Sequence, residues 1–78
     1  MTNLKNIQAV YFLGIGGIGM SALARYFNSI GVRVSGYDRT ETVLTRELTA
    51  EGISVHYTDD IQLADTKANL IVYTPAIP

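Results

Sequence analysis

Apolar residues follow two different periods along this chain, and each period marks one kind of secondary structure. Short apolar or alternating runs, rich in β-branched and aromatic residues, predict strands. These runs lie at 8–13, 32–37, 53–57 and 69–74. The run at 53–57 alternates and suits the edge of a sheet, whereas 69–74 is continuously apolar, as a strand buried on both faces should be.

Two segments between these runs space their apolar residues three or four positions apart, which predicts helices. The first covers about 18–30, and its pattern consists of Met20, Leu23, Phe27 and Ile30. The second covers about 41–51, with Thr40 or Thr42 as N-cap and with Leu44 and Leu48 inward. Gly31 and Gly52 are placed to end the two helices, and a short turn or helix is expected from 58 to 64.

Strands that alternate with helices predict a parallel sheet joined by right-handed crossovers. With the strands numbered along the chain, their expected order across the sheet is 3-2-1-4. The predicted fold is therefore α/β and Rossmann-like, with three αβα layers. Ligands of such sheets bind beyond the carboxyl ends of the strands, where the strand order reverses. Here that point lies between the first and fourth strands.

The first strand runs directly into a glycine-rich loop. Gly14, Gly16 and Gly19 fit the pattern G-x-G-x-x-G, with the strand before it and the helix after it that the pattern requires. Gly14 permits a sharp turn, Gly16 lets a diphosphate approach the backbone, and Gly19 permits close packing of helix and strand. The loop is interpreted as a phosphate-binding turn. A tight turn that binds nothing is the alternative.

Asp38 ends the second strand, 19 positions after Gly19. A Rossmann fold places a carboxylate near this point to accept a hydrogen bond from a ribose hydroxyl. A surface turn residue is the alternative. Arg39 next to it suits either a 2′-phosphate or solvent.

Other residues near the predicted ligand have more than one interpretation. Thr74 ends the fourth strand and either reaches a phosphate or only precedes a proline turn, and Ser21 either faces phosphate or fills space. Gly36 interrupts a strand and indicates a bulge or a close approach. His56 is expected to be structural or solvated. Aromatic residues at strand or helix spacing are expected in the core, namely Tyr11, Tyr26, Phe27 and Tyr57.

Composition limits the possible functions. The 78 residues are expected to form one small domain, and the net charge of −1 gives no reason to expect nucleic acid or a membrane surface as partner. The chain lacks cysteine, a metal-ligand cluster, a G-x-x-x-x-G-K-[ST] loop and a nucleophile–base pair. No long apolar run or signal-peptide layout is seen, so a cytoplasmic location is expected. The chain is therefore expected to bind a ligand, without catalytic or metal-binding residues or a cofactor of its own.

The sequence from Gly14 to Ala24, GIGGIGMSALA, resembles the amino-terminal signature of the Mur ligases that add L-alanine to UDP-N-acetylmuramate in peptidoglycan synthesis. The stretches 35–38 and 72–78 match the same pattern in the same order. The resemblance runs from about Ile7 to the last residue. It implies the UDP-sugar-binding amino-terminal domain, with its carboxyl end truncated, of an enzyme that also has a central ATP-binding domain and a carboxyl-terminal domain.

The resemblance also implies site residues. Loop residues would hold the UDP diphosphate, Asp38 would contact the uridine side, and residues after the fourth strand would contact the diphosphate or muramoyl side. The full set is Gly14, Gly16, Gly17, Ile18, Gly19, Met20, Ser21, Asp38, Thr74, Ala76 and Ile77. ATP and Mg²⁺ would be needed by the full-length enzyme, and this chain alone would not be catalytic.

Two departures from the family pattern affect these expectations. Relatives often have a serine where this chain has Pro75, so one phosphate-facing hydroxyl is lost. Relatives also tend to have a Gly-His pair where this chain has Thr58-Asp59, so the uridine contact of that histidine is not carried over to this chain. An NAD(P)-binding module of an oxidoreductase remains the alternative from another class, supported by Asp38 and Arg39. A purely structural fragment is opposed by the glycine loop.

Overall fold

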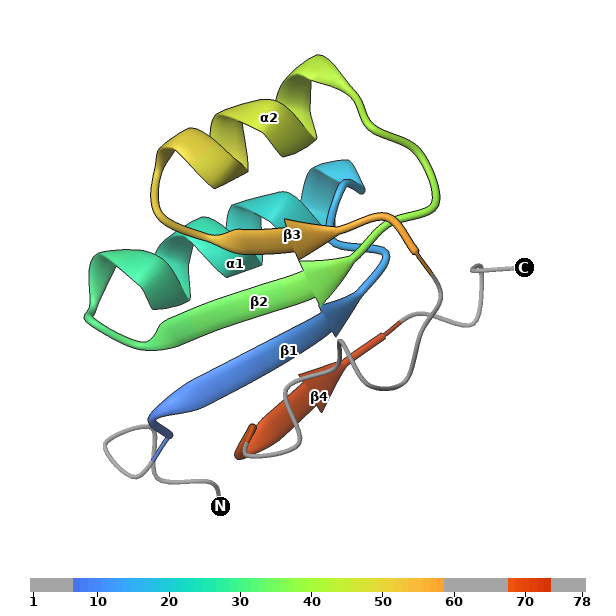
Figure 1. The fold of residues 1–78 in the computed structure, drawn as a ribbon. Helices are drawn as coiled ribbons and strands as arrows, with labels where there is room; N and C mark the ends of the chain where they lie inside the picture. Colours follow the sequence, from blue (N-terminus) through green and yellow to red (C-terminus); the bar gives the residue numbers. More distant parts are fainter. Residues whose placement is uncertain (1–6, 59–67, 74–78) are drawn as a thin grey trace.

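Four parallel strands form one sheet in the computed structural model, which describes residues 7–58 and 68–73. The strands lie in the order β3-β2-β1-β4 (Figure 1). Their bounds are Ala9–Leu13 for β1, Arg33–Tyr37 for β2, Ser54–His56 for β3 and Leu70–Val72 for β4. The predicted α/β class, parallel pairing and strand order are confirmed, and the predicted strand ends differ by one or two residues.

Two helices, α1 (Ile18–Ser29) and α2 (Val43–Ala50), cover the same face of this sheet (Figure 1). Gly31 and Gly52 end them with φ of +85° and +97°, a conformation that glycine adopts without strain. Both predicted helix ends are therefore confirmed. The short turn or helix expected from 58 to 64 falls almost entirely outside the described residues.

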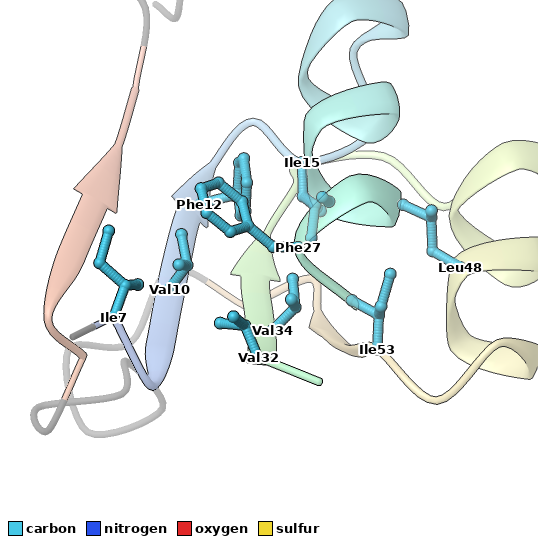
Figure 2. Packing of buried hydrophobic residues seen from close by; sticks show 10 residues of the cluster. Ile7, Val10, Phe12, Ile15, Phe27, Val32, Val34, Leu48 and Ile53 are labelled. Carbon is cyan, nitrogen blue, oxygen red and sulfur yellow. The ribbon is translucent and has the colours of Figure 1, made fainter. Parts of the chain in front are cut away.

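The core lies between the sheet and the two helices (Figure 2). Val10 and Phe12 point from β1 toward the helices, because side chains two residues apart share one face of a strand. Phe27 of α1 packs against Phe12, with ring centroids 6.5 Å apart. Leu48 of α2 is fully buried in the same cluster, so one apolar layer joins both helices to the sheet.

The apolar pattern of α1 misidentified part of its buried face. Ser21, Ala24 and Phe27 are buried, whereas Leu23, Tyr26 and Ile30 are 39%, 49% and 50% exposed. Successive helical residues are rotated by about 100°, so Leu23 and Ile30 lie to one side of Phe27, and small residues occupy the closest approach to the sheet. The expectation that Tyr26 belongs to the core is wrong, while Tyr11 and Phe27 are buried as predicted.

The apolar run of β4 predicted burial on both faces, but only one face of this strand is covered. Ile71 is 56% exposed, whereas Leu70 and Val72 pack against the core cluster. Because neighbouring strand residues point to opposite faces, Ile71 lies on the face that α1 and α2 leave uncovered. The Asn69 side chain helps to fix β4 on β1, since its Oδ1 accepts from the amides of Gln8 and Ala9 at 2.7 and 3.0 Å.

Candidate functional site

The glycine-rich loop leaves β1 through a turn that is fixed by the carboxyl end of β2. Gly14 has φ of +86°, which confirms that the turn needs a glycine here. The amides of Gly14 and Ile15 both donate to the carbonyl oxygen of Tyr37, at 2.7 and 3.0 Å. The amide of Gly17 donates back to the oxygen of Gly14 at 3.1 Å. Backbone hydrogen bonds therefore fix the turn at the start of the loop.

Ile15 anchors the same loop through its side chain. It is fully buried in the core cluster and points inward between the sheet and the helices (Figure 2). It occupies the space above Gly36, where a Cβ would lie 2.8 Å from Ile15 Cδ1 and 2.8 Å from the oxygen of Phe12. The predicted close approach at Gly36 is confirmed, and the group that approaches is Ile15.

Gly16 lies against two side chains from other elements. A Cβ on it would lie 2.7 Å from Asp38 Oδ2 and 2.8 Å from Thr45 Cγ2. Its amide donates to Asp38 Oδ2 at 2.9 Å. This position therefore requires glycine for a reason that the motif alone does not reveal, namely contact with Asp38 and Thr45.

Helix α1 begins at this loop without a side-chain cap. Gly17 is its N-cap residue and provides no side-chain acceptor. The first intrahelical hydrogen bond runs from the amide of Ser21 to the oxygen of Gly17, at 2.7 Å. No hydrogen bond within residues 7–58 and 68–73 takes up the amides of Ile18, Gly19 or Met20. Such unpaired amides, together with the positive end of the helix dipole, form a binding position for an anion.

The structure bears on two predicted roles in this helical turn, those of Gly19 and Ser21. A Cβ on Gly19 would meet no heavy atom within 4 Å, so the expectation that Gly19 permits close packing on the strand is wrong. The residue lies on the outer side of α1. Ser21 is buried, and its hydroxyl donates to the oxygen of Ile18 at 3.0 Å, so its side chain fills space. A ligand contact by Ser21 stays a prediction.

Asp38 lies where the sequence placed it, just beyond β2 and beside the loop. Both carboxylate oxygens accept hydrogen bonds from backbone amides, Oδ2 from Gly16 and Oδ1 from Thr40 at 3.0 Å. Arg39 is exposed, and its side chain has no ion pair or hydrogen bond within the described part of the chain. The structure thus brings Asp38, but not the Arg39 side chain, into the loop's hydrogen-bond network.

His56 has a structural environment, as expected. Its Nε2 and the hydroxyl of Tyr11 are 2.8 Å apart, and its Nδ1 lies 3.0 Å from the oxygen of Thr58. The ring stacks on Tyr11 and is tilted against Tyr37, with centroids 5.8 and 5.6 Å apart. These side chains belong to neighbouring strands, so the ring joins β1, β2 and β3 on the sheet face opposite the helices.

Thr45 is the site-adjacent residue that the sequence analysis missed. It is fully buried beneath Gly16, and its hydroxyl accepts from the hydroxyl of Tyr57 at 2.8 Å. It also forms a reciprocal capping box with Thr42. The signal for this cap in the sequence is a pair of threonines, Thr42 and Thr45, three residues apart at the start of a predicted helix.

The remaining predicted contacts, Thr74, Ala76 and Ile77, lie outside the described residues, as do the departures at Asp59 and Pro75. Within the described ranges, no group of three His, Cys, Asp or Glu side chains is arranged to hold a metal ion. The helices of the described part include none that is long and apolar enough to cross a membrane.

Comparison with known proteins gives a consistent result. Residues 9–78 match the family model described as Mur ligase family, catalytic domain. The UDP-N-acetylmuramate–L-alanine ligase of Flavobacterium johnsoniae is 54% identical over 80 residues, which cover 97% of this chain and 18% of the relative. The ligase of the same name from Christiangramia forsetii is 55% identical over 84 aligned residues, which cover 100% of this chain and 19% of the relative.

A third relative with this name, from Porphyromonas gingivalis, is 51% identical over 77 residues, which cover 92% of this chain and 17% of the relative. The chain thus spans less than a fifth of the length of these relatives. The family model matches most of the chain, and its match includes the whole glycine loop and the strands that hold it. The chain belongs to the Mur ligase family.

Proposed function

We propose that this chain is the UDP-N-acetylmuramate-binding domain of a ligase that adds L-alanine to that nucleotide sugar in peptidoglycan synthesis. The observation that carries the proposal is the uncapped start of α1, where the amides of Ile18, Gly19 and Met20 have no partner within the described residues. A UDP-sugar supplies a diphosphate, which is the kind of group that such amides bind. Relatives of more than 50% identity carry the corresponding ligase name.

The binding step follows from the position of this helix start. The parallel register of Phe12 with Gly36 and Val72 brings the carboxyl ends of β2 and β4 to either side of β1. The loop therefore opens at the point where the strand order reverses, which is the usual ligand position in such sheets. Each amide adds a hydrogen bond to phosphate oxygens, and the helix dipole adds roughly 0.3–1 kcal/mol. Contacts by Asp38 and by residues 74–77 stay predictions.

The proposal extends to the whole protein only through the family. Full-length members are expected to use ATP and Mg²⁺, with a central ATP-binding domain and a carboxyl-terminal domain as partners, in the cytoplasm. Within such a protein, the role proposed for this chain is to bind and orient the nucleotide sugar. The NAD(P)-binding alternative has no support from the family or from the relatives named above.

An NMR titration of the ¹⁵N-labelled chain tests this function. UDP-N-acetylmuramate and UDP, added to millimolar concentration, are expected to shift the amides of Gly17, Ile18, Gly19 and Met20, while NADH and NADPH shift them much less. Gly16→Val should abolish the shifts, because its side chain would displace Asp38 or Thr45 and distort the loop.

Ser54→Ala is the control, because Ser54 is exposed at the first position of β3, whereas the loop lies at the carboxyl end of the strands. It should leave the shifts unchanged. Larger shifts with NADPH than with either uridine nucleotide, lost in Arg39→Ala, would contradict the ligase assignment and favour a dinucleotide-binding module.

A further inference from the structure

The carboxylate of Asp38 already has two backbone partners before any ligand is considered. Oδ2 accepts from the Gly16 amide at 2.9 Å and Oδ1 from the Thr40 amide at 3.0 Å. The backbone amide of Asp38 donates to the oxygen of His56 at 3.1 Å, which fixes the residue against β3. Asp38 therefore connects the loop after β1 to the loop before α2 while it is itself held by the sheet.

Gly16 lies between this carboxylate and the buried Thr45. A Cβ at Gly16 would lie within 2.8 Å of atoms from both residues, so the loop backbone is in close contact with each. Thr45 is fixed in turn, since its hydroxyl accepts from Tyr57 at 2.8 Å and it lies in the capping box of α2. The orientation of the Gly16 peptide is thus set by Asp38 just after β2, by Thr45 of α2 and, through Thr45, by Tyr57 just after β3.

The charge of Asp38 also divides the loop amides into two groups. A carboxylate at the Gly16 amide repels a second anion from that amide. The amides one turn further on, at Ile18, Gly19 and Met20, carry no such group among the described residues. A diphosphate therefore finds its donors at the start of α1, and Gly16 serves to orient that start.

We propose that Asp38 is a positioning residue: it supports diphosphate binding by holding the Gly16 peptide, and thereby the start of α1, in place. This inference rests on the proposed function. It differs from the role that a Rossmann fold suggests for this carboxylate, which is direct contact with the nucleoside. The two roles give different results with a ligand that contains a diphosphate but no ribose or base.

The test compares UDP with inorganic pyrophosphate on the wild-type chain, Asp38→Ala and Asp38→Asn. If Asp38 positions the loop, Asp38→Ala lowers the affinity for UDP and for pyrophosphate by a similar factor, about tenfold, because a charge-assisted hydrogen bond to the loop is lost. Asp38→Asn keeps an oxygen that accepts from Gly16 and should bind pyrophosphate within about threefold of wild type. Loss of UDP affinity with unchanged pyrophosphate affinity in Asp38→Ala would overturn the proposal.

Glu41→Ala is the matched control. It removes one carboxylate from the same loop, and Glu41 has no hydrogen bond to the glycine loop. If Glu41→Ala weakens pyrophosphate binding as much as Asp38→Ala does, the loss is not specific to the contact with Gly16. If Asp38→Ala strengthens binding, the removal of its negative charge outweighs the lost hydrogen bond. Either result refutes the positioning role.

A ligand-free measurement separates this proposal from the proposed function. Amide hydrogen exchange at Gly16 should be slow in the wild type and in Asp38→Asn but faster in Asp38→Ala. Fast exchange at Gly16 in the wild type, which needs no variant to fold, would refute the link. If neither UDP nor pyrophosphate binds while the link is observed, the proposed function fails and the structural link stands.

Discussion

The two helices of the described residues begin in opposite ways. At α2, the Thr42 hydroxyl accepts from the Thr45 amide at 3.1 Å, and the Thr45 hydroxyl accepts from the Thr42 amide at 2.8 Å. At α1, the N-cap is Gly17, which has no side chain to offer. The start of α2 thus uses its own side chains as acceptors for its backbone amides, whereas the start of α1 leaves its amides free to bind a ligand.

This difference explains why only one of them is a candidate binding site. A side-chain cap contributes about 1 kcal/mol to stability and occupies a donor that an anion would otherwise use. The start of α1 gives up that contribution. It is held instead by contacts behind it, through Ile15 in the core and Asp38 on Gly16. Rigidity from neighbouring elements and unoccupied donors at the helix start are therefore compatible.

The largest stability effect is expected where the loop contacts its support. Gly16→Ala should lower the free energy of unfolding by about 1–3 kcal/mol, because the new Cβ would overlap Asp38 and Thr45. Gly19→Ala is the matched variant within the same motif. Its Cβ meets no atom within 4 Å, so stability should be unchanged or rise by up to about 1 kcal/mol. Urea unfolding measures both, and equal effects would contradict the packing described at Gly16.

The capped helix gives the next effect. Thr42→Ala should lower the free energy of unfolding by about 1 kcal/mol, since it removes the hydroxyl that caps α2. Thr40→Ala is the control, because only the backbone amide of Thr40 takes part in the network. UDP affinity should be unchanged in Thr40→Ala. A large loss of UDP affinity in Thr42→Ala alone would show that the capping box that fixes Thr45 also supports the ligand site.

The smallest stability effect has the opposite sign and is the most informative. Gly17→Ser gives α1 the side-chain cap that it lacks. A Cβ there makes only ordinary contacts, at 3.5 Å to the oxygen of Gly14 and 3.6 Å to Met20 Cγ. Stability should rise by a few tenths of a kcal/mol, while UDP affinity should fall about threefold or more as the hydroxyl takes up an amide. Unfolding and titration of one sample give both values, and stabilisation with undiminished UDP affinity would place the ligand elsewhere.

The order of elements, the strand order and the position of the glycine-rich loop could be predicted from the sequence. These features depend on local spacing: apolar periods separate strands from helices, and glycine appears where φ is positive, at Gly14, Gly31 and Gly52. Alternating strands and helices then leave few possible topologies, because parallel crossovers have one hand. The extended glycine signature also indicated the family that the comparisons confirmed.

Tertiary structure alone decided how that loop is supported. The contact between Asp38 and Gly16 joins residues 22 positions apart, and the one between Tyr11 and His56 joins residues 45 apart. Neither spacing follows from a helical or strand period, since each depends on which strands become neighbours and at what register. The way α1 packs on the sheet likewise decides which of its residues are exposed and leaves open space beside Gly19. A periodic pattern shows that a helix has an apolar side, but the packed sheet determines which residues of that side are covered.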